Sequence, residues 1–276
     1  MAYPLQLHPT PSNPNHPVLL CLHGHPGSGA CMEVFTQGLG HRFQTLAPDL
    51  RGYGRSRTRQ DFSLADHLRD LEELLDRQNI GPYWILGWSL GGILALEMAM
   101  RHPDRVQGLI LIATAARPRS NHPPTVWQDD LYTAIASLIN VLIPGWGWNI
   151  RSFGQKSLYR YLLETHTPAT YRYLARYALG AYLRTSPQAH RALRQALGQR
   201  YDRTADLPRI LCPCWVAAGE NDRHITAAAS EETARLLPQA TWQLYPHTAH
   251  LFPWEIPHQM LQDIEAWLQG LASPSP

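Results

Sequence analysis

Residues 87–92 read Gly-Trp-Ser-Leu-Gly-Gly, and this stretch decides the fold. It follows the strand-like run 82–86 and precedes a helical pattern whose apolar positions are Ile93, Leu94, Leu96, Met98 and Met100. The G-x-S-x-G spacing between a strand and a helix predicts a sharp turn at Ser89, because side chains at Gly87 and Gly91 would collide where the two elements cross. Ser89 is therefore the predicted nucleophile, and the amide of Leu90 at the helix start is a predicted oxyanion donor. The alternative is a tight structural turn in a doubly wound sheet.

A serine hydroxyl reacts only when a base removes its proton and a third group orients that base. The apolar run 210–218 leads into Gly219-Glu220-Asn221-Asp222, and the strand pattern 241–245 leads into His247-Thr248-Ala249-His250. Their positions favour Asp222 over Glu220 as the acid and His250 over His247 as the base. The order Ser, Asp, His separates this arrangement from the two other common serine-hydrolase orders. The competing interpretation is that these are solvated loop charges and two ordinary members of a set of 14 histidines.

Three further motifs lie in order along the chain. His23-Gly24-His25-Pro26-Gly27-Ser28 follows the strand pattern 18–22, Asp49 to Ser56 reads D-L-R-G-Y-G-R-S, and Glu255-Ile256-Pro257 follows His250. With these motifs nearly the whole chain resembles the α/β-hydrolase superfamily, of the kind with a helical cap. The resemblance implies that His25 donates the second oxyanion amide. Two departures are Ala249, where members usually carry glycine, and a short N-terminus with little room for an opening hairpin.

Strand and helix patterns alternate outside the middle of the chain, which predicts an α/β fold with a mostly parallel, doubly wound sheet. Strands are expected near residues 18–22, 44–48, 82–87, 108–113, 210–217 and 241–245. A helix is expected from Leu64 to about Gln78, with Leu64, Leu68, Leu71 and Leu75 facing the sheet. Between residues 117 and 205 the alternation stops. The predicted domains are thus a core of residues 1–116 and 206–276 and an inserted helical cap of residues 117–205.

The predicted cap is strongly basic. It contains eleven arginines and one lysine against four carboxylates, a net charge of +8, while the rest of the chain carries −6. One interpretation is attraction of an anionic substrate, assisted by Arg51, Arg55, Arg57 and Arg59; the other is that the arginines lie on solvated faces or pair with core acids. The candidate substrate-binding residues are Trp88, Arg55, Trp146 and Trp148. Tyr173 and Tyr177 form a helical stripe that suits either packing or a pocket wall.

One apolar stretch of the predicted cap, Leu131 to Pro144, is followed by Gly145-Trp146-Gly147-Trp148. It is too short to span a bilayer. The stretch fits either a lid that buries an acyl chain or touches a lipid surface, or ordinary packing of the cap on the core.

The expected activity is hydrolysis of a carboxylic ester through an acyl-enzyme. The alternatives are a carbon–carbon bond hydrolase, a perhydrolase, a lyase like the menaquinone-pathway synthase, and a non-catalytic binding protein of the same fold. That synthase carries arginine where this chain has Ile93, which counts against it. No phosphate-binding loop, dinucleotide fingerprint or metal cluster is evident, so neither cofactor nor metal is expected. The expected partner is a small molecule, with no nucleic acid and no membrane span, and the expected location is cytoplasmic. The oligomeric state is left open.

Overall fold

The computed structural model describes residues 2–10 and 13–272, and a seven-stranded sheet forms its centre. The strand order is β1-β3-β2-β4-β5-β6-β7, and only β1 is antiparallel to its neighbour, β3. The strands are β1 (Gln6–His8), β2 (Val18–Leu22), β3 (Gln44–Asp49), β4 (Tyr83–Trp88), β5 (Val106–Ile112), β6 (Cys214–Gly219) and β7 (Ala240–Tyr245). The prediction of a mostly parallel α/β sheet is confirmed.

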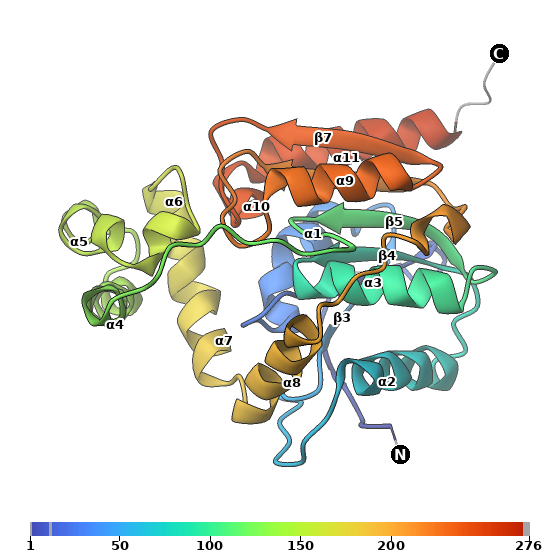
Figure 1. The fold of residues 1–276 in the computed structure, drawn as a ribbon, viewed down its shortest axis with the longest axis horizontal. Coiled ribbons are helices and arrows are strands. Elements are labelled where there is room, and N and C mark those ends of the chain that lie inside the picture. Colours follow the sequence, from blue (N-terminus) through green and yellow to red (C-terminus); the bar gives the residue numbers. More distant parts are fainter. Residues whose placement is uncertain (1, 11–12, 273–276) are drawn as a thin grey trace.

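Helices connect the parallel strands and also fill the middle of the chain (Figure 1). Those of the outer thirds are α1 (Glu33–Gly38), α2 (Leu64–Arg77), α3 (Leu90–Arg101), α9 (Ala227–Leu236), α10 (Phe252–Glu255) and α11 (Pro257–Ala272). Those between β5 and β6 are α4 (Trp127–Leu142), α5 (Gly147–Ser152), α6 (Pro168–Tyr173), α7 (Leu179–Leu183) and α8 (Pro187–Gly198), with a π-helical turn (Leu174–Ala178) joining α6 to α7.

Alternate residues of each strand pack on opposite faces of the sheet, as the period of two requires. On one face, Leu20, Ile85 and Leu109 contact the apolar sides of α2, α3 and α9. On the other face, Leu19, Leu86 and Ile110 pack with α1, α10 and α11. The sheet is thus covered on both sides, and β2 to β6 are buried along nearly their whole length, whereas the edge strands β1 and β7 are partly exposed.

One strand was not anticipated, and one predicted strand begins four residues later than expected; the other strands lie within two residues of their predicted bounds. The short β1 was not anticipated; it forms because Gln6–His8 pairs with residues 47–49 of β3, a long-range contact that a polar three-residue run does not reveal. The strand expected from residue 210 begins only at Cys214, since a 3-10 turn (Leu207–Arg209) and Pro213 precede it. Proline lacks the N–H that a strand ladder needs, so pairing starts after it.

The helices between β5 and β6 extend from one end of the sheet (Figure 1). Of these helices, α4, α5 and α6 lie away from the core, and α7 and α8 lead back toward α2. Tyr173 attaches this segment to the core, because its ring stacks on Trp254 at 4.6 Å and its hydroxyl donates to the carbonyl of Cys31. The stripe of Tyr173 and Tyr177 therefore serves packing against the core, where Tyr177 also donates to Glu33. Within the described ranges, no helix is both long and apolar enough to cross a membrane.

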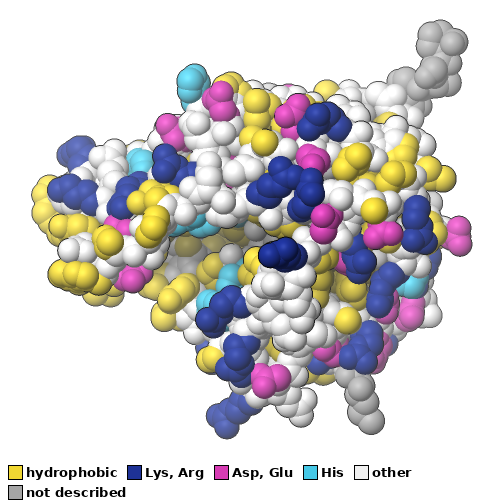
Figure 2. Space-filling model, in the orientation of Figure 1, with side chains coloured by type: hydrophobic (Ala, Val, Ile, Leu, Met, Phe, Trp, Pro, Cys, Tyr) yellow, Lys and Arg dark blue, Asp and Glu magenta, His cyan; other side chains and the backbone are white. Residues whose placement is uncertain are grey.

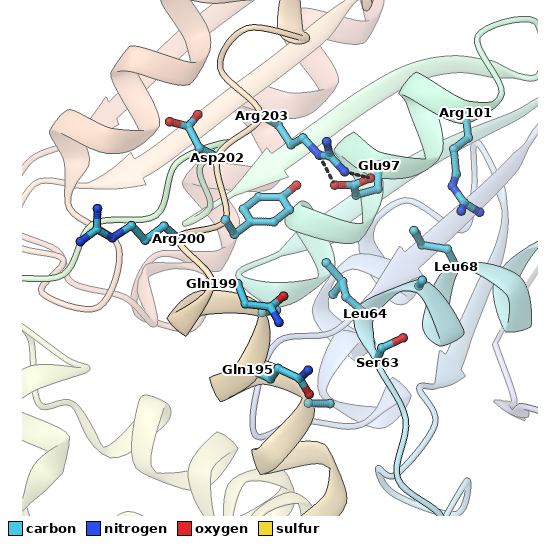
Figure 3. Close-up of a pocket in the computed structure, with 14 residues that line it drawn as sticks. Ser63, Leu64, Leu68, Glu97, Arg101, Gln195, Gln199, Arg200, Asp202 and Arg203 are labelled. Atoms are coloured by element: carbon cyan, nitrogen blue, oxygen red, sulfur yellow. Dashed lines mark hydrogen bonds and ion pairs between the residues drawn. The ribbon is translucent and has the colours of Figure 1, made fainter.

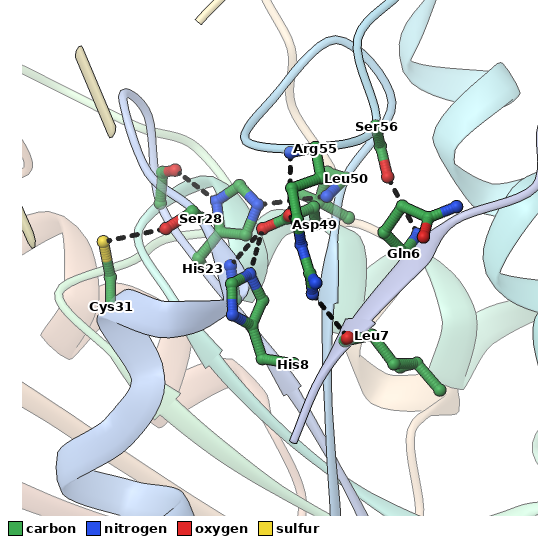
Figure 4. Close-up of polar contacts among 12 residues, drawn as sticks. Gln6, Leu7, His8, His23, Ser28, Cys31, Asp49, Leu50, Arg55 and Ser56 are labelled. Carbon is green, nitrogen blue, oxygen red and sulfur yellow. Dashed lines mark hydrogen bonds and ion pairs between the residues drawn. The ribbon is translucent and has the colours of Figure 1, made fainter. Parts of the chain in front are cut away.

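The D-x-R-G-x-G-x-S stretch folds around the buried carboxylate of Asp49 (Figure 4). Asp49 accepts hydrogen bonds from His8 and from the amides of Gly29 and Arg55, each at 2.8 Å. Burial alone would raise the pKa of this carboxyl, but the hydrogen bonds outweigh it and lower the pKa to about 2. Asp49 thereby ties β1, the loop after β2 and the turn after β3 into one unit beside the site.

The closest approach in the core is between α3 and β2. A Cβ at Gly91 would lie 2.0 Å from the carbonyl oxygen of Leu22, which is backbone and cannot yield. We expect Gly91→Ala to lower the free energy of unfolding by about 3 kcal/mol, since overpacking against backbone forces the elements apart. Gly180→Ala in α7 is the matched control, because a Cβ there meets nothing within 4 Å. Chemical denaturation of both variants checks this; equal stability of the two would contradict it.

Candidate active site

Ser89 occupies the turn between β4 and α3 with φ 54° and ψ −115°, in a region that residues other than glycine rarely adopt. The conformation is imposed by the tight crossing behind it: a Cβ at Gly87 would lie 2.4 Å from the carbonyl oxygen of Gly91. The amide of Ser89 donates to Ile112 on β5, and its carbonyl accepts from the Thr114 hydroxyl at 2.8 Å. The backbone of the strained residue is therefore held from both sides, and Ser89 lines the cavity described below.

His250 and Asp222 form a buried pair at the same edge of the sheet. His250 Nδ1 lies 2.7 Å from Asp222 Oδ2, and both side chains are almost fully buried. The other carboxylate oxygen, Oδ1, accepts from the amides of His224 and Ile225 at 2.8 and 3.0 Å. With its carboxylate fixed in this way, Asp222 holds the imidazole so that Nε2 is the ring nitrogen left for another partner.

The rival residues lie elsewhere. Glu220 and His247 are both exposed, and the Glu220 carboxylate accepts from the amide of His247 at 3.1 Å. That contact closes the turn after β7 and leaves both side chains outside the cavity lining. The geometry therefore favours Asp222 and His250 over their neighbours.

Glu255 and Trp88, to which the sequence analysis gave no part in positioning His250, hold the histidine loop. Glu255 accepts from the amide of Ala249 at 3.0 Å and also from the amides of Glu164 and Thr165, so one carboxylate connects this loop to the inserted helices. Burial raises the pKa of Glu255 against these hydrogen bonds. Trp88 packs 5.5 Å from the His250 ring and donates to its carbonyl. Ala249 has a φ outside the left-handed region, so the loop does not need glycine at this position.

The loop after β2 presents its backbone to Ser89. Burial lowers the pKa of His23 to about 4, and its ring bridges the carbonyl of Gly24 and the amide of Leu50. His25 is joined to Pro26 by a cis peptide bond. Its ring meets the hydroxyl of Tyr53 at 2.7 Å and Nδ1 of His190 on α8 at 3.0 Å. Both imidazoles therefore fix the loop, of which His25 and Pro26 line the cavity described below.

A cavity of about 990 Å³ brings the predicted residues together. Ser89, Leu90, His25 and His250 all line it, and among the described contacts no protein acceptor is recorded for the amides of His25 and Leu90. Within residues 13–272 no hydrogen bond joins Ser89 to His250, although both residues line the cavity. The inserted helices contribute the opposite wall, which includes Leu158, Leu162, Leu193, Leu197, Arg200 and His122.

A second cavity, of about 510 Å³, lies between α2, α3 and α8 (Figure 3). Residues 200–202 line both cavities, so this segment is the wall between them. Arg203 anchors the wall to α3, because its Nε donates to the Glu97 carboxylate at 2.7 Å. The second cavity contains neither Ser89 nor His250.

The four candidate substrate-binding residues do not line the catalytic cavity. Arg55 pairs with Asp49 and donates to the carbonyl of Leu7, so its charge already has partners within the protein. Trp88 is buried behind His250. Trp146 and Trp148 are exposed at the start of α5. None of the four is among the residues that line this cavity, so their assignment to substrate binding stays a prediction from the sequence.

Comparison with known proteins identifies the architecture. Residues 17–142 match the family model described as alpha/beta hydrolase fold. A solved esterase from Thermogutta terrifontis, with malate bound, superimposes with a TM-score of 0.72 at 26% identity, covering 98% of this chain and 94% of that one.

Two curated relatives extend over most of the chain. The "Magnesium-chelatase 30 kDa subunit" of Rhodobacter capsulatus is 30% identical, over 82% of this chain and 78% of the relative. The "Pimeloyl-[acyl-carrier protein] methyl ester esterase" of Nitrosomonas europaea is 28% identical, over 91% and 96%.

Four histidines, two of them buried and two half-buried, make the stability sensitive to acid. Burial lowers the pKa of His23 to about 4 and those of His25, His67 and His224 to about 3. Below pH 6.5 the unfolded chain binds protons at these residues and the folded chain does not, so stability falls as the pH falls toward 4. His67, on α2, packs between the rings of Phe62 and Tyr53 and does not line the cavity.

As the pH falls from 6 to 4, we therefore expect the unfolding free energy of His67→Phe to decrease less than that of wild type, by about 1.4 kcal/mol for each pH unit. Urea titrations at several pH values measure the slope. His258→Gln, at an exposed position of α11, is the control. An unchanged slope for His67→Phe would mean that this ring is not kept neutral by its surroundings.

Proposed function

The chain belongs to the α/β-hydrolase fold family and is an enzyme, and from this premise we propose that it cleaves carboxylic esters with Ser89 as the nucleophile. The observation that carries the proposal is the 2.7 Å contact of His250 with Asp222 at the wall of the cavity that Ser89 also lines. Esters are the substrate class that needs the fewest additional groups. The Nitrosomonas relative is named for a methyl ester, which supports the same class.

In the proposed reaction the Ser89 hydroxyl attacks the ester carbonyl while His250 Nε2 accepts its proton. Asp222 keeps the proton of the imidazole on Nδ1 and stabilises the imidazolium that forms. The amides of His25 and Leu90 donate to the oxyanion, and the N-terminal end of α3 adds a favourable dipole. His250 then passes the proton to the departing alcohol, which leaves Ser89 acylated. Water activated by the same imidazole releases the acid.

Residues 117–205 act in this proposal as a cap domain over the core of residues 1–116 and 206–276. The support is the shared cavity, whose floor is core and whose opposite wall is Leu158, Leu162, Leu193 and Leu197 of the inserted segment. These leucines suit an acyl chain of small or medium length. A triad oriented by buried hydrogen bonds and two unpaired amides serves no purpose in a protein that only binds, so the non-catalytic alternative is less well supported.

We expect Ser89→Ala to abolish labelling by a fluorophosphonate probe and to lower kcat/KM for p-nitrophenyl esters by about four orders of magnitude or more. Asp222→Asn should cost about 10⁴ in kcat because the imidazole loses its orienting acceptor. Glu220→Gln is the matched control, since that carboxylate lies two residues away and outside the cavity lining. Probe labelling that survives in Ser89→Ala would remove the proposed nucleophile. A wild type that labels but turns over no ester would favour the lyase alternative.

The substrate of this proposal carries an anionic group. Arg200 lines the cavity, and no carboxylate among the described residues lies within 4.0 Å of its guanidinium. Arg117, the other arginine of the lining, is paired with Glu232. Arg200 is thus the cavity arginine whose charge is available to a ligand. The similarity to an esterase solved with malate bound is consistent with an anionic ligand.

Arg200→Gln should raise KM for an ester with a terminal carboxylate by about tenfold and leave KM for the matching neutral ester unchanged, because removing one unscreened ion pair costs about 1.4 kcal/mol. The panel includes methyl esters of dicarboxylic and monocarboxylic acids of equal length. Arg184→Gln, an exposed arginine outside the cavity lining, is the control. Equal effects on the charged and the neutral ester would contradict an anionic substrate. The cytoplasmic location expected from the sequence stays a prediction.

A further inference from the structure

Helix α4 buries polar side chains and exposes apolar ones, the reverse of an ordinary surface helix. Its buried face carries Asp129, Ser137 and Asn140, and each of these polar side chains has a partner: Arg160, the Tyr159 hydroxyl and the carbonyl of Tyr171 respectively. Its outer face carries side chains that are 46–74% exposed, namely Trp127, Leu131, Leu138 and Leu142. These four lie at the spacing of one helix face. The apolar stretch that packing on the core would have covered is therefore directed to solvent.

The exposed apolar surface continues past the end of the helix. Ile143, Trp146 and Trp148 are 52%, 42% and 46% exposed, and the two indole rings lie 4.9 Å apart. We call the combined surface the apolar tip; it comprises Trp127, Leu131, Leu138, Leu142, Ile143, Trp146 and Trp148. Figure 2 shows hydrophobic side chains gathered at the outer end of the lobe that holds α4 and α5, with Lys and Arg side chains beside them. A contiguous apolar patch of this kind marks an interaction surface.

Cations border the apolar tip. The Cγ of Arg172 lies against Gly145 and the guanidinium of Arg151 lies against Gly147, so both side chains border the loop that carries Trp146. Lys156, in the turn after α5, is exposed as well. Within residues 13–272 no carboxylate lies within 4.0 Å of the charged groups of these three residues. Asp130 is the exposed carboxylate of α4, and Asp129 is already paired with Arg160.

We propose that the apolar tip docks on the surface of an anionic phospholipid bilayer. An amphipathic helix, indole rings at the level of the headgroups and unpaired cations beside them are the combination that such a surface binds. A second copy fits less well, because an isologous contact through the tip would bring the Arg151 and Arg172 rims of both copies together. Docking leaves the protein peripheral, since α4 has 16 residues.

Docking would place the cavity near the membrane. The amide of Leu158, which lines the cavity, donates to the Thr133 hydroxyl of α4, so the tip and this cavity wall belong to one packed lobe. The proposal itself concerns binding and does not depend on the ester chemistry.

The test is co-sedimentation of the full chain with vesicles of phosphatidylcholine, with and without phosphatidylglycerol. Binding is expected to the vesicles that contain phosphatidylglycerol and to weaken with salt. Leu138→Glu with Leu142→Glu should lower the partition coefficient by more than about tenfold. Arg151→Ala and Arg172→Ala should lower it by about fivefold for each charge removed. Leu211→Glu is the control; this side chain is 65% exposed just before β6, outside the lobe, and its variant should bind like wild type.

A second measurement does not depend on the glutamate variants. Trp127, Trp146 and Trp148 are the exposed tryptophans of the described chain, so lipids brominated on the acyl chains should quench the fluorescence of wild type. Trp127→Phe with Trp148→Phe should remove most of that quenching. The proposal is overturned if the protein binds neither kind of vesicle. It is also overturned if binding is unaffected both by Leu138→Glu with Leu142→Glu and by Arg151→Ala with Arg172→Ala. A dimer in light scattering that Leu138→Glu with Leu142→Glu dissociates overturns it as well, because a second copy would then cover the tip.

Discussion

The close crossing of β4 and α3 is the constraint on which the site depends. Backbone meets backbone there: a Cβ at Gly87 would strike Gly91, and one at Gly91 would strike the carbonyl of Leu22 on β2. Only a chain without side chains at these points can turn from strand to helix in a single residue, and Ser89 takes the positive φ that this turn requires. The same turn that strains the serine also starts α3 behind it, so the nucleophile and the amide of Leu90 come from one local geometry.

The partners of Ser89 are held by contacts of another kind. Asp222 is fixed by two backbone amides, the His250 loop by Glu255 and Trp88, and the ring of His25 by Tyr53 and His190. Two of these hydrogen bonds join distant parts of the chain: Trp88 with His250, and His25 with His190. All six are buried or partly buried, so the groups lose little further freedom when a substrate arrives, which is the condition for electrostatic preorganisation.

What the sequence could predict follows from how local each feature is. The turn at Ser89 and the loops at Asp222 and His250 were predictable, since turn residues directly follow apolar strand patterns. Strand β1 was not, because Gln6–His8 becomes a strand only by pairing with β3. Arg55 was predicted to bind substrate because the sequence shows its charge but does not show that Asp49 is its partner. The helical period of α4 was equally readable, but periodicity shows which residues share a face and not which face the core covers. Its polar face proved to be the inner one because Arg160, Tyr159 and Tyr171 supply partners.

The excess of positive charge in residues 117–205 separates, in the structure, into two groups with different physical roles. Arg117, Arg191 and Arg203 pair with Glu232, Asp61 and Glu97 of the core, and these contacts hold the inserted helices at the sheet edge. Such exposed or half-buried pairs contribute little energy singly but set the position of the segment. Arg200 at the cavity and Arg151 and Arg172 at the tip lack carboxylate partners among the described residues. Arg184 and Arg194 have no carboxylate partner among the described residues either, so a missing partner does not by itself mark a binding arginine. Under the proposals made above, attraction of an anion and attachment to the core are not alternatives for this segment, because they would use different arginines.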